Sequence, residues 1–116
     1  MHTAGRIYND LKPENIMISF DEKEGQTTEQ VTLIDFGLTS KYMRKDKTHI
    51  KDSETTEIFC GNIHFASLDQ MNFYRTSRKD DIISLYFMMI WLLNNNDLVG
   101  DPKDIDDIKA LKRKGI

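Results

Sequence analysis

The stretch YNDLKPEN, residues 8–15, decides how the rest of the chain is interpreted. It places a carboxylate at Asp10, an ammonium at Lys12 and a carboxamide at Asn15, with Pro13 stiffening the loop between them. Transfer of a phosphoryl group to a hydroxyl needs such groups close together. The carboxylate orients the hydroxyl, the ammonium neutralises phosphoryl charge, and the neutral amide oxygen can join a magnesium shell. By itself, this loop also fits a polar turn before a strand.

A second stretch, LIDFG at residues 33–37, adds another carboxylate. An apolar strand delivers Asp35 to its end, where a hard oxygen ligand suits a magnesium ion that bridges phosphates. Phe36 can pack inward, and Gly37 supports the loop by permitting a sharp change of backbone direction. The tripeptide alone is weak evidence, but its order and its distance of about thirty residues from the first stretch match a known set of phosphoryl-transfer motifs.

The residues between and after these stretches predict a hairpin and then a long loop. Residues 16–20 and 31–34 are short β-prone runs, and the polar stretch 21–30 between them, with Gly25, predicts a hairpin with a long loop. Residues 38–59 are polar, charged and aperiodic, which is typical of a functional or mobile loop.

Helices are predicted in the rest of the chain. Ser77 or Asp80 can cap the first, within residues 77–96, and its core at residues 82–93 is apolar all round, which indicates a helix buried on every side. The methionines and the tryptophan of this run are therefore expected in the core: Met88, Met89 and Trp91.

A further helix is expected to begin at the Asp-Pro pair of residues 101–102 and to end near Gly115. Its apolar residues recur at helical spacing on one face: Ile105, Ile108 and Leu111. The predicted order is a loop, a hairpin, a long loop and then helices.

Composition excludes several classes of protein. A chain of 116 residues with 39% hydrophobic and 30% charged residues is typical of one soluble globular domain, and a net charge of −3 gives no reason to expect nucleic acid or an anionic membrane as a partner. The single cysteine, Cys60, excludes an internal disulfide and a Cys-based zinc site, and suits a reducing compartment. The N-terminus has no signal-peptide pattern, so a cytoplasmic or nuclear location is expected.

Together the motifs resemble those of eukaryotic protein kinases. Two later stretches, GNIHFAS at residues 61–67 and SRKDDIISL at residues 77–85, resemble the casein kinase 1 group. The resemblance covers nearly the whole chain. It implies an α+β, mainly helical, C-terminal kinase lobe over residues 1–116, with a small hairpin carrying the catalytic and Asp-Phe-Gly loops. It also implies a serine/threonine protein kinase that uses ATP and Mg²⁺ and acts on protein Ser or Thr hydroxyls.

The resemblance assigns a role to each matching residue. Asp10 resembles the catalytic base and Lys12 the lysine that contacts the phosphates of ATP. Asn15 and Asp35 resemble the magnesium ligands. Asp81, at the start of the central helix, resembles the residue that anchors the catalytic-loop backbone, although it can also serve as a helix cap.

Three positions depart from the family pattern. Tyr8 and Asn9 stand where such kinases carry His and Arg, and without that Arg control by activation-loop phosphorylation is not expected. Asn62 replaces a Thr. The acidic residues 52–57 argue against carrying over a preference for acidic substrates, and the basic side chains before them form either an anion site or a solvated face: Lys41, Arg44, Lys45, Lys47 and Lys51.

The motifs that clamp ATP in this family do not occur in the sequence: a Gly-rich loop, a strand lysine and its partner glutamate. We therefore expect part of a kinase domain, without the nucleotide lobe, inactive alone and with apolar surface left for a partner. Two hypotheses stay open: an enzyme of the casein kinase 1 group, or a catalytically inert kinase-like scaffold within an assembly.

Overall fold

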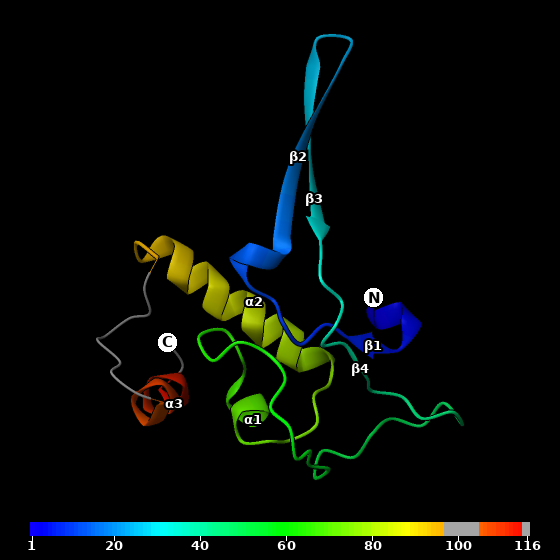
Figure 1. Cartoon of the computed structure of the whole chain (residues 1–116), viewed down its shortest axis with the longest axis vertical. Helices are drawn as coiled ribbons and strands as arrows, with labels where there is room; N and C mark the ends of the chain where they lie inside the picture. Colours follow the sequence, from blue (N-terminus) through cyan, green and yellow to red (C-terminus); the bar gives the residue numbers. More distant parts are fainter. Residues whose placement is uncertain (97–104, 115–116) are drawn as a thin grey trace.

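The computed structural model describes residues 1–96 and 105–114. It contains helices and small antiparallel sheets, so the prediction of an α+β chain is confirmed at that level (Figure 1). Two short 3₁₀ turns lie at His2–Ala4 and Pro13–Asn15. The strands are β1 (Arg6–Ile7), β2 (Ile16–Lys23), β3 (Gln26–Leu33) and β4 (Ser40–Lys41), and the helices are α1 (Leu68–Met71), α2 (Arg78–Leu93) and α3 (Ile105–Arg113).

The predicted hairpin is present, but its long loop is wrong. β2 and β3 pair without a break from Ile16↔Leu33 to Lys23↔Gln26, and only Glu24 and Gly25 form the turn. Both turn residues have positive φ, 55° and 78°, and such two-residue turns match the right-handed twist of the paired strands. The polar residues expected in a loop therefore extend the ladder, and the hairpin projects away from the helices (Figure 1).

The predicted central helix is confirmed, and both candidate caps take part in its start. Asp80 accepts a hydrogen bond from the backbone N–H of Ser77 at 2.8 Å, and its other oxygen accepts one from the Ser67 hydroxyl. Asp80 is buried, and a carboxylate at a helix N-terminus also complements the helix dipole. The first turn of α2 is thereby fastened to the N-cap of α1.

Only one side of α2 is buried within the described part of the chain. Phe87 and Met88 pack with Phe65, and the Trp91 ring meets Phe65 edge-to-face at 5.6 Å between centroids. The opposite side is exposed, with relative exposures of 61% at Ile82, 53% at Met89, 53% at Leu92 and 85% at Leu93. The prediction of a helix buried on every side, with Met89 in the core, is therefore wrong, because no described element covers that face.

The apolar interior is divided into three small clusters rather than one core. They centre on Ile7 with Tyr42 and Ile50, on Ala66 with Met71 and Ile108, and on Phe65 with Phe87 and Met88. The radius of gyration is 16.2 Å, against about 13 Å expected for a compact domain of this length. The described chain thus lacks a single closed core.

The second predicted helix corresponds to α3, of which Ile108 is buried, Leu111 is half-buried and Ile105 is exposed. Its predicted start at residues 101–102 and its predicted stop at Gly115 lie outside the described residues. Among the helices that the structure describes, none combines the length and apolar character that crossing a membrane requires.

The stretch 38–59 is mostly irregular, as predicted, but it is tied to the rest of the fold. β4 pairs with β1, and Glu54 binds Arg44 and Arg75, with a distance of 2.8 Å from Glu54 Oε2 to Arg75 Nη1. The predicted basic and acidic runs of this loop therefore neutralise each other in part. Arg44 is engaged by a carboxylate and is not free to form an anion site.

The buried amine of Lys112 fastens α3 to the segment before α1. Its Nζ donates to the carbonyls of Ile63, at 2.7 Å, and Ala66, and it lies 4.8 Å from the centre of the Phe87 ring. Burial lowers the pKa of Lys112 from 10.5 to about 7. The folded chain therefore favours the neutral amine at a pH where the unfolded chain still binds the proton.

We predict that the free energy of unfolding rises with pH between about 7 and 10, because over this range the unfolded chain binds more protons at Lys112 than the folded chain does. The slope from this residue is at most about 1.4 kcal/mol per pH unit. Urea unfolding at several pH values measures it. Lys112→Met should remove this rise, whereas the exposed control Lys114→Met should retain it; equal slopes in both variants would contradict the prediction.

Candidate active site

Asp81, in the first turn of α2, binds the backbone of the loop that carries Asp10. The Asp81 carboxylate accepts hydrogen bonds from the backbone N–H groups of Tyr8, at 2.8 Å, and Asn9, at 2.9 Å. The Nε2 atom of His2 lies 2.7 Å from the same carboxylate. Asp81 is buried, as are Tyr8 and Asn9. Charge-assisted hydrogen bonds are strong when water is excluded, so this contact holds the loop firmly.

Asp10, Lys12 and Asn15 lie together at the end of this loop. The Nδ2 atom of Asn15 donates to both the Asp10 carbonyl and Asp10 Oδ2, each at 2.9 Å, and Lys12 Nζ is 3.9 Å from Asp10 Oδ2. Both partners of the amide are acceptors, which fixes its orientation. The Oδ1 end of Asn15 therefore points away from Asp10 and is the end suited to a cation.

One oxygen of Asp10 is left without a donor. Asp10 is only 6% exposed, and its Oδ1 atom has no hydrogen-bond partner among the described residues. A buried acceptor without a donor is costly, by about 1–3 kcal/mol, and such groups occur where a ligand supplies the missing bond. A hydroxyl placed at Oδ1 would be oriented by the carboxylate.

Tyr8 connects this loop to the segment that carries Asp35. Its hydroxyl donates to the carbonyl of Ile34, and its ring meets Phe36 edge-to-face at 5.7 Å between centroids. Burial, with the charges of Asp10 and Asp35 in smaller measure, raises the pKa of the Tyr8 phenol above its usual value of 10. The phenol therefore stays protonated and acts as a donor. No pattern in the sequence predicted this link between Tyr8 and Ile34.

Asp35 lies on the exposed side of the site and is not bonded to Asp10, Lys12 or Asn15 in the described contacts. It has a φ of 58°, a conformation that Asp tolerates better than most residues, and its Oδ1 accepts from the Gly37 N–H at 3.2 Å. The change of backbone direction expected at Gly37 thus occurs at Asp35. Phe36, expected to pack inward, is 52% exposed.

Asp35 and Asn15 offer the types of oxygen atom that magnesium prefers. The described residues include no cluster of three or more His, Cys, Asp or Glu side chains able to hold a metal ion. One carboxylate, Asp35, and one amide, Asn15, are the proposed ligands. Magnesium in phosphoryl-transfer sites is held in this way, with few protein ligands, several waters and oxygens of the nucleotide.

Two buried amides around the loop were not predicted from the sequence. Asn9 is only 4% exposed, with a φ of 71°. Gln70 donates through Nε2 to the carbonyls of Asn9, at 3.0 Å, and Cys60, joining α1 to both the Asp10 loop and the residue that follows the long irregular segment. Asn62, by contrast, accepts from the His64 N–H at 2.8 Å and belongs to a local turn.

Gly61 lies against these groups, because a Cβ atom there would be 2.3 Å from Gln70 Nε2 and 2.8 Å from the Asn9 carbonyl oxygen. We predict that Gly61→Ala destabilises the chain by about 2–4 kcal/mol in urea unfolding. Gly25→Ala is the matched control: Gly25 also has positive φ, but no atom within 4 Å of the added carbon, so a loss of at most about 1 kcal/mol is expected. Equal losses would show that the contact with Gln70 is unimportant.

Comparison with known proteins agrees with this geometry. The chain is 30% identical over 92 residues to a protein of Encephalitozoon cuniculi named "Probable casein kinase I homolog", covering 79% of this chain and 26% of that protein. It is 32% identical over 98 residues to a casein kinase 1-like protein of Oryza sativa subsp. japonica, covering 80% of this chain and 13% of that protein. The chain thus spans about a quarter of the length of the first relative and about an eighth of the length of the second. The family model for the protein kinase domain matches residues 1–114, and the chain therefore belongs to the protein kinase family.

Proposed function

We propose that the chain is the catalytic part of the C-terminal lobe of a casein kinase 1-like serine/threonine protein kinase. The observation that carries this proposal is the unpartnered, buried Oδ1 atom of Asp10, next to Lys12 and Asn15. This arrangement presents an acceptor for a hydroxyl, a cation for phosphoryl charge and an amide oxygen for Mg²⁺.

The chain's residues would act mainly by positioning. Asp10 accepts the hydrogen bond of the attacking Ser or Thr hydroxyl and holds its oxygen toward the phosphorus. Lys12 neutralises charge on the transferring group. Asn15 and Asp35 would hold Mg²⁺, which supplies charge neutralisation at the phosphates of ATP. Asp81 keeps the loop in place through the N–H groups of Tyr8 and Asn9.

The exposed apolar face of α2 supports a further part of this proposal. Ile82, Leu85 and Met89 are exposed, and an apolar groove beside them is lined by Leu11 and Leu33. Apolar patches of this kind are usually covered in the functional protein. We propose that other segments of the kinase, or a partner, cover this face, and that the ATP-clamping motifs absent from residues 1–116 lie in the same longer protein, inside the cell.

A second candidate function is an inert kinase-like scaffold, which the same exposed face and the changes at Tyr8, Asn9 and Asn62 favour. The two candidates differ in what they require of the acidic residues. A scaffold has no chemical need for Asp10 or Asp35, whereas the enzyme requires both.

The test uses the polypeptide that carries this chain together with whatever precedes it in its reading frame. We predict a Mg²⁺-dependent rise in melting temperature with ATP and transfer of the γ-phosphoryl group to protein Ser or Thr. Asp10→Asn should lower the transfer rate by roughly 10²–10⁴-fold and preserve the thermal shift, because it removes the hydroxyl acceptor and leaves both metal ligands. Asp35→Asn should abolish the shift and the transfer.

Asp21→Asn, on the exposed hairpin, is the matched control and should change neither quantity. Absence of any Mg²⁺-dependent rise in melting temperature at saturating ATP would contradict the proposal of an enzyme and favour the scaffold.

A further inference from the structure

Asn9 uses all of its polar atoms in hydrogen bonds to other segments. Its N–H donates to Asp81, and its carbonyl accepts from Gln70 Nε2 at 3.0 Å. In the side chain, Nδ2 donates to the Leu38 carbonyl at 2.8 Å and to Ser40 Oγ at 2.9 Å, while Oδ1 accepts from the Thr76 hydroxyl at 2.5 Å. A buried amide that is fully satisfied in this way specifies one arrangement of the segments around it.

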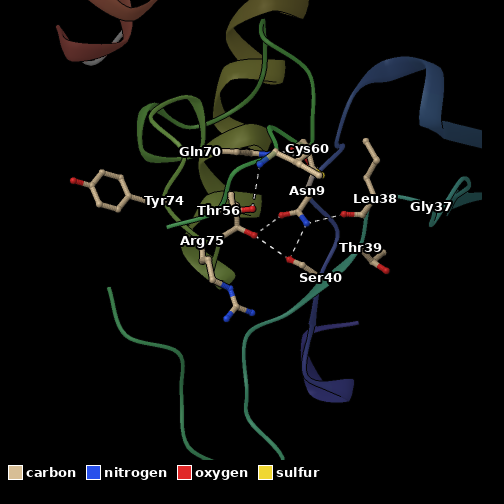
Figure 2. A pocket seen from close by; sticks show the side chains of 12 residues that line it. Asn9, Gly37, Leu38, Thr39, Ser40, Thr56, Cys60, Gln70, Tyr74 and Arg75 are labelled. Carbon is tan, nitrogen blue, oxygen red and sulfur yellow. Dashed lines mark hydrogen bonds between the residues drawn. The ribbon is translucent and has the colours of Figure 1, made fainter. Parts of the chain in front are cut away.

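These contacts join parts of the chain that are far apart in sequence. Leu38 and Ser40 lie directly after the Asp-Phe-Gly loop, and Thr76 lies directly before α2. Ser40 Oγ and Thr76 Oγ1 are themselves 3.1 Å apart, which closes a triangle with the Asn9 amide. We call the side chains of Asn9, Ser40 and Thr76 the Asn9 network; Figure 2 shows the Asn9 amide directed at Ser40 and at the Leu38 carbonyl.

The Asn9 network carries no charge and needs no added group. Its members are an amide and two hydroxyls, which form one wall of a cavity of about 170 Å³. Hydrogen bonds between neutral groups depend little on ionic strength, whereas an ion pair on the surface weakens as salt is added. The contact from Asn9 is also compatible with its left-handed backbone, since Asn adopts positive φ more readily than most residues.

We propose that Asn9 is a positioning residue that holds the start of the long segment 38–59 in place against the Asp10 loop through neutral hydrogen bonds, without any phosphate on that segment. The proposal rests on the proposed function only for its meaning for catalysis, namely that the unmodified protein already holds the segment after Asp35 beside the Asp10 loop. The hydrogen bonds themselves do not depend on catalysis.

The test measures amide hydrogen exchange in the unphosphorylated chain. Asn9→Gly removes the side chain and tolerates the φ of 71°. We expect the amides of Ser40 and Tyr42, which face β1 in the β1–β4 pair, to lose protection by about ten-fold or more. Asn95→Gly is the matched control, because Asn95 is exposed and also has positive φ, at 55°. It should leave those amides unchanged.

A double-mutant cycle separates direct positioning from general destabilisation. Ser40→Ala should reduce protection of the same amides, and adding it to Asn9→Gly should have little further effect, because the bond that it removes is already absent. Protection in the wild-type chain should also be nearly the same at about 0.05 M and about 1 M salt.

Unchanged protection in Asn9→Gly, or full additivity in the cycle, would overturn the proposal. Protection that appears only after the segment is phosphorylated would overturn it as well. Because the readout is exchange and not phosphoryl transfer, these results are independent of whether the kinase proposal succeeds.

Discussion

The arrangement of the candidate site depends on the hydrogen bonds from two backbone N–H groups, of Tyr8 and Asn9, to the buried carboxylate of Asp81. Asp81 lies in the first turn of α2, so the position of the Asp10 loop is set by this helix. The neighbouring Asp80 caps the same turn and binds Ser67. Two adjacent carboxylates thus fasten α2 to the Asp10 loop on one side and to α1 on the other.

The positions of the other site residues follow from these two hydrogen bonds to Asp81. With the backbone of residues 8 and 9 held, the Tyr8 phenol reaches the carbonyl before Asp35, and the Asn9 amide reaches the segment after it. The two loops that carry the acidic residues are therefore connected through neutral side chains rather than through their carboxylates. Among the described residues, this leaves the Oδ1 atom of Asp10 without a partner and the Asp35 side chain exposed, as the proposed site for a hydroxyl and a shared cation requires.

Local patterns predicted the presence of the hairpin and the position of α2, because each of these depends on residues that are neighbours in the sequence. The catalytic role of the Asp10 loop stays a prediction. The hairpin length was wrong, since Glu24 and Gly25 were not recognised as a complete two-residue turn. The prediction that α2 is buried on every side was also wrong. An apolar run shows that a helix is able to be buried, but it does not show that the described residues include an element that packs against each of its faces. The side-chain contacts of Asn9 join residues 29 to 67 positions apart, which no local pattern reveals.

The most direct test of the central claim is hydrogen exchange at the Tyr8 and Asn9 amides in the wild-type chain and in Asp81→Asn, which removes the charge and replaces one of the two acceptor oxygens with an NH₂ donor of the same shape. The account predicts that both amides are protected in the wild type. In the variant at least one of the two amides should exchange on the order of 30-fold faster or more, as the loss of a charged acceptor implies, while amides in the middle of α2 keep their protection. Unchanged exchange at both Tyr8 and Asn9 in the variant would contradict the claim that Asp81 holds the Asp10 loop in place.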